Sequence, residues 1–316
     1  MRGYLLDINP SGRDDVILWV KRLDGRVISH EIKWMPRIYV HGSLENLIKL
    51  GRLLSQRYLI DFVERSVRPG SPPETVLEIM IPFGDKKRVA NFILDLGNHQ
   101  LFHVYNVDLP SMQEFLYQYE LHPTALIDLS GDEFDVLDSI EDVDYDLSWI
   151  RVAYLDAEVR VSSIAPKFSD KLQEIVISVG DERIVLDGSE DRILGNLTKT
   201  LDDLNVDAII TDSGDSFLLP YLHYRAHVNG VDLRLGRSRD PKTFKPSSTY
   251  FSYGRVYCRF RGFKLKGRVH IDPSNSMLYH ETGLDGLIEV SRVARIPIQD
   301  AARYTIGSCM SSLQYY

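Results

Sequence analysis

The sequence is poor in the features that mark secreted, membrane-spanning and zinc-binding proteins. It has 2 cysteines among 316 residues, Cys258 and Cys309, which cannot form a disulfide framework and match no zinc-ligand spacing. No apolar run reaches the roughly 18 residues that a membrane-spanning helix needs, and the N-terminus shows no signal-peptide pattern. We therefore expect a cytoplasmic protein whose two thiols are free and buried.

Three common nucleotide-handling motifs are also missing. The chain has no Gly-x-x-x-x-Gly-Lys phosphate loop, no Gly-x-Ser-x-Gly nucleophile elbow and no dinucleotide-binding glycine pattern. These absences disfavour P-loop hydrolases, α/β-hydrolases and nicotinamide-dependent dehydrogenases.

Charge is spread unevenly along the chain. The sequence carries 37 Lys and Arg against 45 Asp and Glu, a net charge of −8. From Asp128 to Asp146 there are nine acids and no base, whereas from Arg234 to Arg268 eleven Lys or Arg accompany one acid, Asp240. The acidic stretch predicts an exposed connector. The basic stretch is the candidate for contact with nucleic acid, because the average charge hides such local asymmetry.

The first half of the chain predicts a β-meander followed by a ferredoxin-like α+β domain. Short apolar runs separated by turn residues give the meander strands at 4–8, 16–22 and 27–33, and Asp24-Gly25 is a strong hairpin signal. The next segment follows the βαββαβ order of the ferredoxin-like, RNA-recognition-like arrangement. Its elements are expected at 37–40, 44–54, 59–67, 76–81, 85–96 and 101–106.

The second half predicts an RNase H-like α/β domain. Three strands, a helix, a strand and a second helix are read from the apolar periodicity. They are expected at 150–156, 172–178, 183–186, 190–204, 208–211 and from about 216 onward. A hairpin-rich region at 250–271 and two helices, at 284–294 and 298–313, complete the chain.

Two carboxylates end the first strand of this second domain. Asp156 and Glu158 are separated by one residue, so a strand turns both side chains toward the same face. Paired carboxylates at the end of a buried strand supply half of the ligands that a two-metal phosphodiesterase needs. The other half has to come from acids later in the chain.

Short motifs in the first half resemble the N-terminal domain of archaeal family B DNA polymerases. They are Leu5–Ile8, Trp34–Val40 and Asn106–Pro110 followed by Phe115–Tyr117.

Motifs in the second half continue the resemblance in the same order. Leu155–Glu158 looks like the first motif of the family's 3′→5′ exonuclease domain. Ser213–Phe217 with Pro220–Leu222 resembles the second. Gly267–Asp272 resembles the strand after the exonuclease hairpin, and Glu289–Gln314 is similar to the segment that leads into the polymerase palm.

The resemblance covers the chain in four blocks. Residues 1–130 correspond to the polymerase-type N-terminal domain, 131–148 to the acidic connector, 149–290 to the exonuclease-like domain, and 291–316 to a helical tail leading toward a palm domain. The sequence stops before the first polymerase motif, so we do not expect this chain to polymerise DNA. It is interpreted as a piece of a longer chain or as one half of a split gene.

The resemblance also implies that the exonuclease is inactive. Family members hold two divalent metals with four carboxylates, and Asp156 and Glu158 match the first two. The third carboxylate should directly follow the motif phenylalanine, where this chain has Leu218. The fourth should come from a Tyr-x-x-x-Asp helix that is absent after Asp272. Mg²⁺ or Mn²⁺ is therefore expected to bind weakly if it binds at all, as in a divergent subgroup with decayed exonuclease motifs.

Two replacements for the missing ligands are open. Asp215, three residues before Leu218, could turn toward the site, although a structural role beside the helix is favoured. His280 and Asp285 have a spacing found in related histidine-containing exonucleases.

The basic stretch alternates cations with aromatic side chains. Cations neutralise phosphates and aromatic rings stack on bases, so such a ribbon is suited to single-stranded DNA. An amphipathic hairpin with its rings in the core explains the alternation equally well. The candidate nucleic-acid-binding residues are Arg255, Tyr257, Arg259, Phe260, Arg261, Lys264, Lys266 and Arg268. His223 and His227, four residues apart, are interpreted as a solvated helix face.

Three functions are weighed from the sequence. The first is a DNA-binding, catalytically inactive N-terminal and exonuclease-like module that supports replication or repair, with DNA and a palm-bearing chain or domain as partners. The second is a working 3′→5′ exonuclease with rearranged ligands. The third is a protein-interaction scaffold for a polymerase subunit.

Overall fold

The computed structural model describes residues 1–316 except 69, 132, 162–163, 239–247, 253–254, 260–261 and 313–316. The chain divides into two compact units. The first consists of Met1–Ile8, Leu18–His30 and His122–Ser311, and the second is built mainly of Asn9–Ile17 and Glu31–Leu121. The boundary near residue 130 that the sequence indicates is not where the structure divides the chain, because the first strands of the meander group with the later domain.

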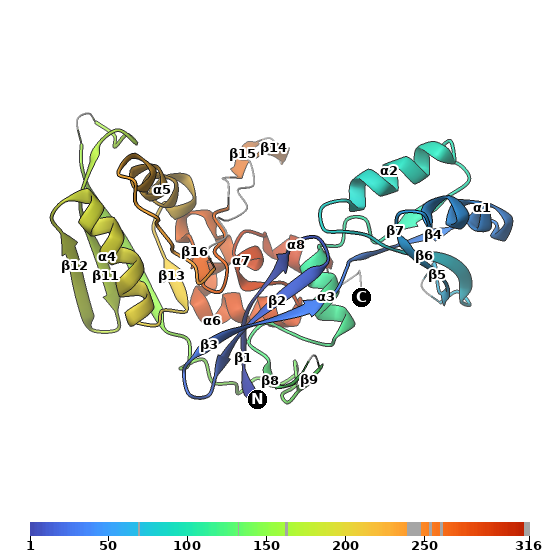
Figure 1. The fold of residues 1–316 in the computed structure, drawn as a ribbon, viewed down its shortest axis with the longest axis horizontal. Helices are drawn as coiled ribbons and strands as arrows, with labels where there is room; N and C mark the ends of the chain where they lie inside the picture. The colour runs from blue at the N-terminus through green and yellow to red at the C-terminus, as the bar shows by residue number, and fades with distance from the viewer. Residues whose placement is uncertain are drawn as a thin grey trace. The chain divides into compact units, whose positions relative to one another are not determined.

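A five-stranded mixed sheet organises the first unit (Figure 1). Its order is β12-β11-β10-β13-β16, in which the first three strands are antiparallel and the last three are parallel. The strands are β10 (Val152–Arg160), β11 (Lys171–Val179), β12 (Glu182–Asp187), β13 (Ala208–Ile210) and β16 (Val269–Ile271). This arrangement confirms the predicted RNase H-like fold.

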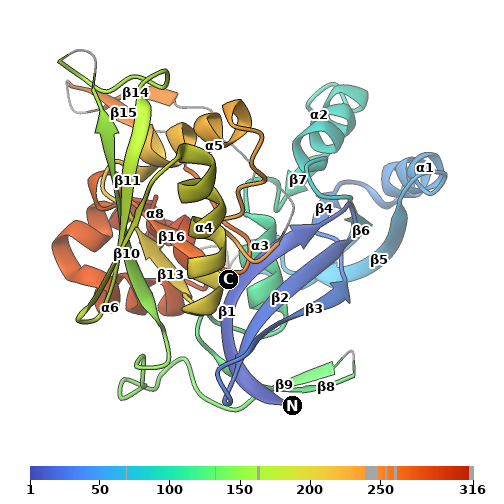
Figure 2. The same cartoon turned by 60° about the vertical axis from the view of Figure 1, so that its left-hand side comes forward.

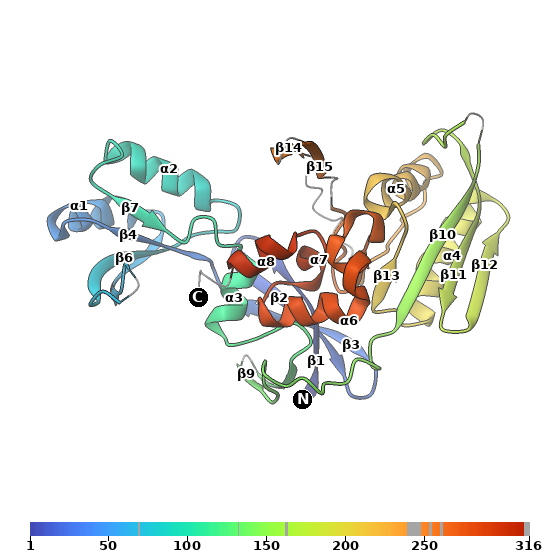
Figure 3. The ribbon, with the colours of Figure 1, turned by 180° about the vertical axis from the view of Figure 1, so that it is seen from behind.

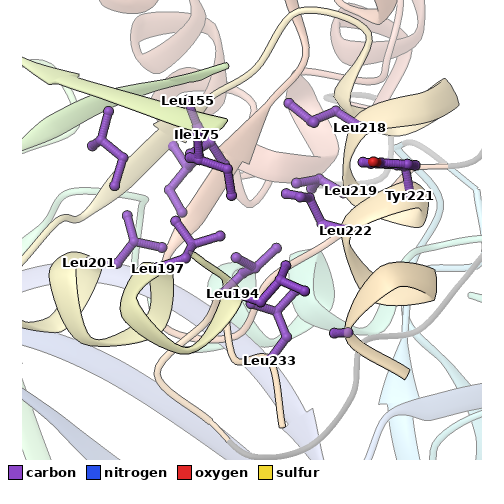
Figure 4. Close-up of a cluster of buried hydrophobic side chains, with 14 of the residues drawn as sticks. Leu155, Ile175, Leu194, Leu197, Leu201, Leu218, Leu219, Tyr221, Leu222 and Leu233 are labelled. Carbon is purple, nitrogen blue, oxygen red and sulfur yellow. The ribbon is translucent and has the colours of Figure 1, made fainter. Parts of the chain in front are cut away.

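Two helices cover one face of this sheet, α4 (Glu190–Asp203) and α5 (Leu219–Val228). Figure 2 shows α4 lying along β10 and β11. Four apolar residues of α4 recur at the helical spacing and are buried, Ile193, Leu194, Leu197 and Leu201. Together with Leu155 and Ile175 from the sheet and Leu219 and Leu222 from α5, they form one apolar core (Figure 4).

The predicted meander is part of a second sheet of order β3-β2-β1-β8-β9. Its strands are β1 (Arg2–Ser11), β2 (Asp15–Arg22), β3 (Val27–Lys33), β8 (Leu126–Ser130) and β9 (Glu133–Val136). The acidic stretch thus contributes the end of β8 and all of β9, and its described residues have little regular structure between β9 and β10.

The second unit contains the predicted βαββαβ arrangement. Its sheet has the order β5-β6-β4-β7, and α1 and α2 supply apolar side chains to the core beneath it. The elements are β4 (Arg37–His41), α1 (Leu44–Leu54), β5 (Leu59–Arg65), β6 (Glu74–Met80), α2 (Lys86–Leu96) and β7 (His103–Tyr105). Ser43 caps α1 by accepting a hydrogen bond from the Asn46 backbone N–H, as its position before the helix predicts.

Helix α3 (Ser111–Gln118) follows β7 and was not predicted as a helix. Its Glu114 side chain is buried and forms an ion pair with Lys86 at the start of α2. Burial raises the pKa of Glu114, and the charge of Lys86 opposes that rise. Because Gln113 and Glu114 are polar yet buried in this short helix, its sequence gives a weak periodic signal.

The C-terminal helices differ from the expected pair. Helix α6 (Met277–Val293) begins earlier than predicted and is kinked at Gly283, whose φ is 68°. The single helix expected at 298–313 is two short helices, α7 (Ile298–Ala301) and α8 (Ile306–Ser312). Thr305 accepts a hydrogen bond from the Ser308 backbone N–H at 3.1 Å, which starts α8 anew. Figure 3 shows α6 beside α7, and α7 also contacts β16.

Buried polar contacts join the first strands of the chain to the RNase H-like sheet. Asp7 on β1 accepts a hydrogen bond from the Gly267 backbone N–H at 3.0 Å. Lys21 on β2 is ion-paired with Asp207, just before β13, and donates to the Trp149 carbonyl at 2.7 Å. These contacts explain why Met1–Ile8 and Leu18–His30 belong to the first unit.

None of the helices in the described part of the chain is both long enough and apolar enough to cross a membrane.

Replacing Gly267 by alanine tests the junction between β1, β2 and β16. Gly267 has a φ of +74°, and a Cβ atom there would lie 2.6 Å from the Trp19 ring. We expect Gly267→Ala to lower the free energy of unfolding by about 1–3 kcal/mol from backbone strain alone, with a further loss from displacing Trp19. Urea unfolding monitored by circular dichroism measures the change.

Gly195→Ala is the matched control. Gly195 lies on the exposed face of α4, and a Cβ there meets nothing within 4 Å. Alanine is expected to stabilise that helix by about 0.5–1 kcal/mol. Equal effects of the two substitutions would contradict the assigned packing at Gly267.

Candidate functional site

The paired carboxylates lie on the exposed face of β10. Tyr154, Asp156 and Glu158 alternate with the buried Ala153 and Leu155, so their side chains share the face opposite the α4–α5 core. A bulge between Glu158 and Val159 interrupts the register with β11 just beyond them. Both carboxylates are therefore accessible to solvent and to a ligand.

A tyrosine pair lies beside these carboxylates. The hydroxyl groups of Tyr154 on β10 and Tyr279 on α6 share a hydrogen bond. Burial, reinforced by this bond, raises the pKa of Tyr279 to about 12. The hydrogen bond links α6 to the strand that carries Asp156 and Glu158.

The position of the expected third ligand is apolar and buried. Leu218 ends a π-helical turn, Gly214–Leu218, directly before α5. Its side chain is 5% exposed and packs into the core with Leu219 and Leu222 (Figure 4). A leucine cannot ligate a metal, and its side chain fills apolar space that a carboxylate could not occupy without a large cost.

The donors present do not fit a two-metal centre. Across the residues that the structure describes, no group of three or more His, Cys, Asp or Glu side chains could hold a metal ion. Two-metal phosphoryl chemistry needs a set of ligands that clamps both cations. Asp156 and Glu158 are too few for that set, so no reaction step is assigned to a metal here.

Asp215 is engaged in a structural network and is not directed at Asp156 and Glu158. Its side chain is 2% exposed and accepts hydrogen bonds from the Phe263 backbone N–H, the Asn275 amide and the Nε and Nη2 groups of Arg303, at 2.6–3.0 Å. Burial acts to raise the pKa of Asp215, but the charges of Arg303 and His270 and these hydrogen bonds outweigh it and lower the pKa. The structural role is thus favoured, although Asp215 acts as an internal anion and makes no helix-capping hydrogen bond.

His270 completes the same network from β16. The ring is fully buried, and its Nδ1 lies 2.7 Å from the Phe263 carbonyl and 2.9 Å from Nη2 of Arg303. Its Nε2 lies 2.8 Å from the Thr211 hydroxyl. Burial, with the nearby Arg303 charge, lowers the pKa of His270 to about 4.

The alternative pair, His280 and Asp285, lies on α6 on either side of the Gly283 kink. Both side chains are exposed. Neither belongs to a metal-holding group among the described residues.

The structure changes the assignment of the basic candidates. Arg268 is 1% exposed and donates to the carbonyls of Val206, Leu201 and Leu235 and to Asp202. Its inclusion among the nucleic-acid-binding residues was wrong, because the guanidinium is buried with its donors occupied. Lys264 is half-buried and ion-paired with Asp300.

The other basic candidates fall on the hairpin β14 (Ser248–Ser252) and β15 (Arg255–Arg259) and its flanks. The two strands pair antiparallel, and β15 carries Arg255, Tyr257 and Arg259, so the predicted hairpin is present in the backbone. Phe260 and Arg261 lie outside the described residues, and their predicted role stays a prediction.

A cavity of about 350 Å³ lies where the sequence analysis placed a solvated helix face. His223 and His227 line it from α5, and Lys264 and Lys266 line it from the segment before β16. The i, i+4 spacing of the histidines was the available signal. It was insufficient because the facing lysines are about forty residues away in the sequence.

Comparisons with known proteins extend the resemblance. No protein-family model matches the chain. A curated DNA polymerase from Archaeoglobus fulgidus is 24% identical over 289 residues, covering 86% of this chain and 34% of the relative. The structure of the family B DNA polymerase from the hyperthermophilic archaeon Pyrobaculum calidifontis matches with a TM-score of 0.76 and 16% identity, covering 99% of this chain and 50% of that one.

These matches confirm the resemblance to the N-terminal half of a family B DNA polymerase that the motifs indicated. The structural match establishes the fold. The chain spans about a third of the length of the curated relative and half of the solved polymerase.

The buried histidine predicts a specific pH dependence of stability. The unfolded chain binds a proton at His270 below pH 6.5, whereas the folded protein resists protonation down to a pKa of about 4. Stability from this residue is therefore complete above pH 6.5 and is lost as the pH falls through that window. We expect wild type to lose on the order of 3 kcal/mol more than His270→Gln between pH 7 and pH 4.

Urea unfolding at several pH values measures the difference. Glutamine retains one donor and one acceptor, so the contacts with Phe263 and Thr211 can persist. Parallel pH profiles for the two proteins would refute the assigned burial of a neutral His270.

Proposed function

We propose that this chain is a nucleic-acid-binding, catalytically inactive N-terminal and exonuclease-like module of a family B DNA polymerase. Its similarity to polymerases from Archaeoglobus fulgidus and Pyrobaculum calidifontis supports a polymerase-related module. Support for DNA replication or repair, in the cytoplasm and together with a palm-bearing chain or domain, is the role we infer.

The observation that carries the inactivity is Leu218. In the family pattern an acid at this position would face the same metals as Asp156 and Glu158. Here the position is filled by a side chain that belongs to the core. Loss of a single outer-shell partner costs roughly 10–100-fold in metal affinity or activity, and loss of direct carboxylate ligands is expected to cost more.

DNA contact is assigned to the basic hairpin and not to the β10 carboxylates. Without bound cations, Asp156 and Glu158 repel phosphate, so a strand passing over β10 is disfavoured. Arg255 and Arg259 are both on β15. Their side chains are the ones we expect to neutralise phosphates.

A digestion assay tests the inactivity. We expect 5′-labelled single-stranded DNA, incubated with Mg²⁺ or Mn²⁺, to be shortened no faster by wild type than by Asp156→Ala. Denaturing gel electrophoresis of a time course measures the rate. Robust 3′→5′ trimming that Asp156→Ala abolishes would overturn the proposal and favour a working exonuclease with rearranged ligands.

A salt series tests the DNA-binding hairpin. We expect Arg259→Ala combined with Arg261→Ala to weaken binding of single-stranded DNA and to reduce the slope of log affinity against log salt by about 0.7 per lost phosphate contact. Fluorescence anisotropy with labelled oligonucleotides measures both quantities.

The matched control for that series is Lys171→Ala combined with Lys199→Ala, two exposed cations on β11 and α4. Affinity that is unchanged by the arginine substitutions would remove the hairpin from the proposal. A wild-type protein that binds no DNA would leave the protein-interaction scaffold as the better explanation.

A further inference from the structure

The cavity of about 350 Å³ in the first unit is built by three segments. Helix α5 contributes His223, Ala226 and His227, the loop that follows α5 contributes residues 231–236 and Ser238, and the segment before β16 contributes residues 263–266. Its size is within the roughly 300–1,000 Å³ of small-molecule sites. Asp156, Glu158 and Leu218 do not line it, so it is separate from the exonuclease-like site.

One side of the cavity is apolar and aromatic. Leu233, Leu235 and Leu265 are buried in its lining and belong to the same core as Phe263. The imidazole of His223 stacks on the Phe263 ring with centroids 5.0 Å apart and planes at 26°. A flat aromatic ligand can extend such a stack, and nucleic-acid bases stack on aromatic side chains regardless of sequence.

The polar part of the lining is strongly biased toward basic residues. Five of its side chains are basic, and Asp232 is the one acid among the described lining residues. The basic members are His223, His227, Arg234, Lys264 and Lys266. Two of these cations are fixed by carboxylates that do not line the cavity, Arg234 by Asp202 and Lys264 by Asp300. Those pairs hold the two cationic groups in place, and their remaining N–H groups can donate hydrogen bonds to an anion.

We propose that this cavity binds a nucleotide, with its base against the apolar and aromatic side and its phosphate against His227, Lys264 and Lys266. The nucleotide could be free in solution or be the end of a single strand, since both present a base and a phosphate. Binding of a strand end would extend the DNA-binding function proposed above and depends on it. Binding of a free nucleotide does not depend on it.

The direct test uses thymidine compounds and isothermal titration calorimetry on the whole chain. We expect dTMP to bind more tightly than thymidine or inorganic phosphate, because either of those fills only part of the cavity. Equal affinity for dTMP and phosphate, or no heat with dTMP at millimolar concentration, would overturn the proposal.

Charge reversal locates the binding. His227→Glu, on the exposed side of α5, and Lys266→Glu, on a different element, are each expected to weaken dTMP binding roughly tenfold through loss of a hydrogen bond to the phosphate and repulsion by the new carboxylate. Lys199→Glu on α4 is the control and is expected to leave affinity unchanged. Thermal unfolding measures whether each variant is folded. If Lys266→Glu is unstable, the test relies on His227→Glu, which changes an exposed residue. Wild-type affinity in both folded variants would refute the site.

Oligothymidylate distinguishes the two sources. Competition between dTMP and a labelled oligonucleotide of about eight residues, weakened by the same two variants, identifies a strand end as the ligand. Binding of dTMP without such competition identifies a free nucleotide. If the oligonucleotide binds the protein but dTMP does not bind in the cavity, the proposed nucleotide site is wrong and the proposed DNA-binding function is retained. If dTMP binds but no oligonucleotide binds, the nucleotide site is retained and the DNA-binding function is rejected.

Discussion

The buried ion pair between Asp215 and Arg303 is the interaction on which the rest of the exonuclease-like site depends. It joins the π-helical turn before α5 to the turn after α7, and His270, Asn275 and the Phe263 backbone complete it. Breaking one partner of such a buried pair costs about 3–5 kcal/mol, because the other charge is left uncompensated. In this turn, Asp215 is therefore buried in an ion pair, and Leu218 packs in the apolar core. Neither residue can present a carboxylate to Asp156 and Glu158.

The regular elements were predictable because their residues obey local periodicities. The range of α1 was read directly from its apolar spacing and from Ser43, and β3 from a bounded β-rich run. Helix α3 was missed because its buried face includes Gln113 and Glu114, whose partners lie elsewhere in the chain. The break between α7 and α8 was missed for a similar reason: Arg303 is helix-compatible by propensity, but its guanidinium is drawn to an aspartate 88 residues earlier.

The candidate site was predictable only where it depended on strand geometry. Alternation alone placed Asp156 and Glu158 together. Charge counting was less reliable, because the basic stretch is partly neutralised by acids from other segments. Arg268 and Arg234 pair with Asp202, Arg237 with Asp207, and Lys264 with Asp300. Counting charges along the sequence gives the number of charged residues in a segment. Only those that are exposed and unpaired in the folded protein are available to bind DNA. The cavity lined by His223 and His227 could not be predicted for the same reason, because its lining residues come from separate parts of the sequence.

The fold does not need the two carboxylates that the family pattern would add to Asp156 and Glu158. A cluster of four carboxylates without cations is destabilising, since like charges at short range repel. Replacing one member by a buried leucine removes that repulsion and adds roughly 1.5–3 kcal/mol of apolar burial. Active-site groups commonly cost stability in this way. The two remaining carboxylates are exposed on β10, where solvation makes them inexpensive to keep. The sheet, the α4–α5 core and the Asp215–Arg303 pair therefore do not depend on a full set of metal ligands, which agrees with the inactivity that we propose.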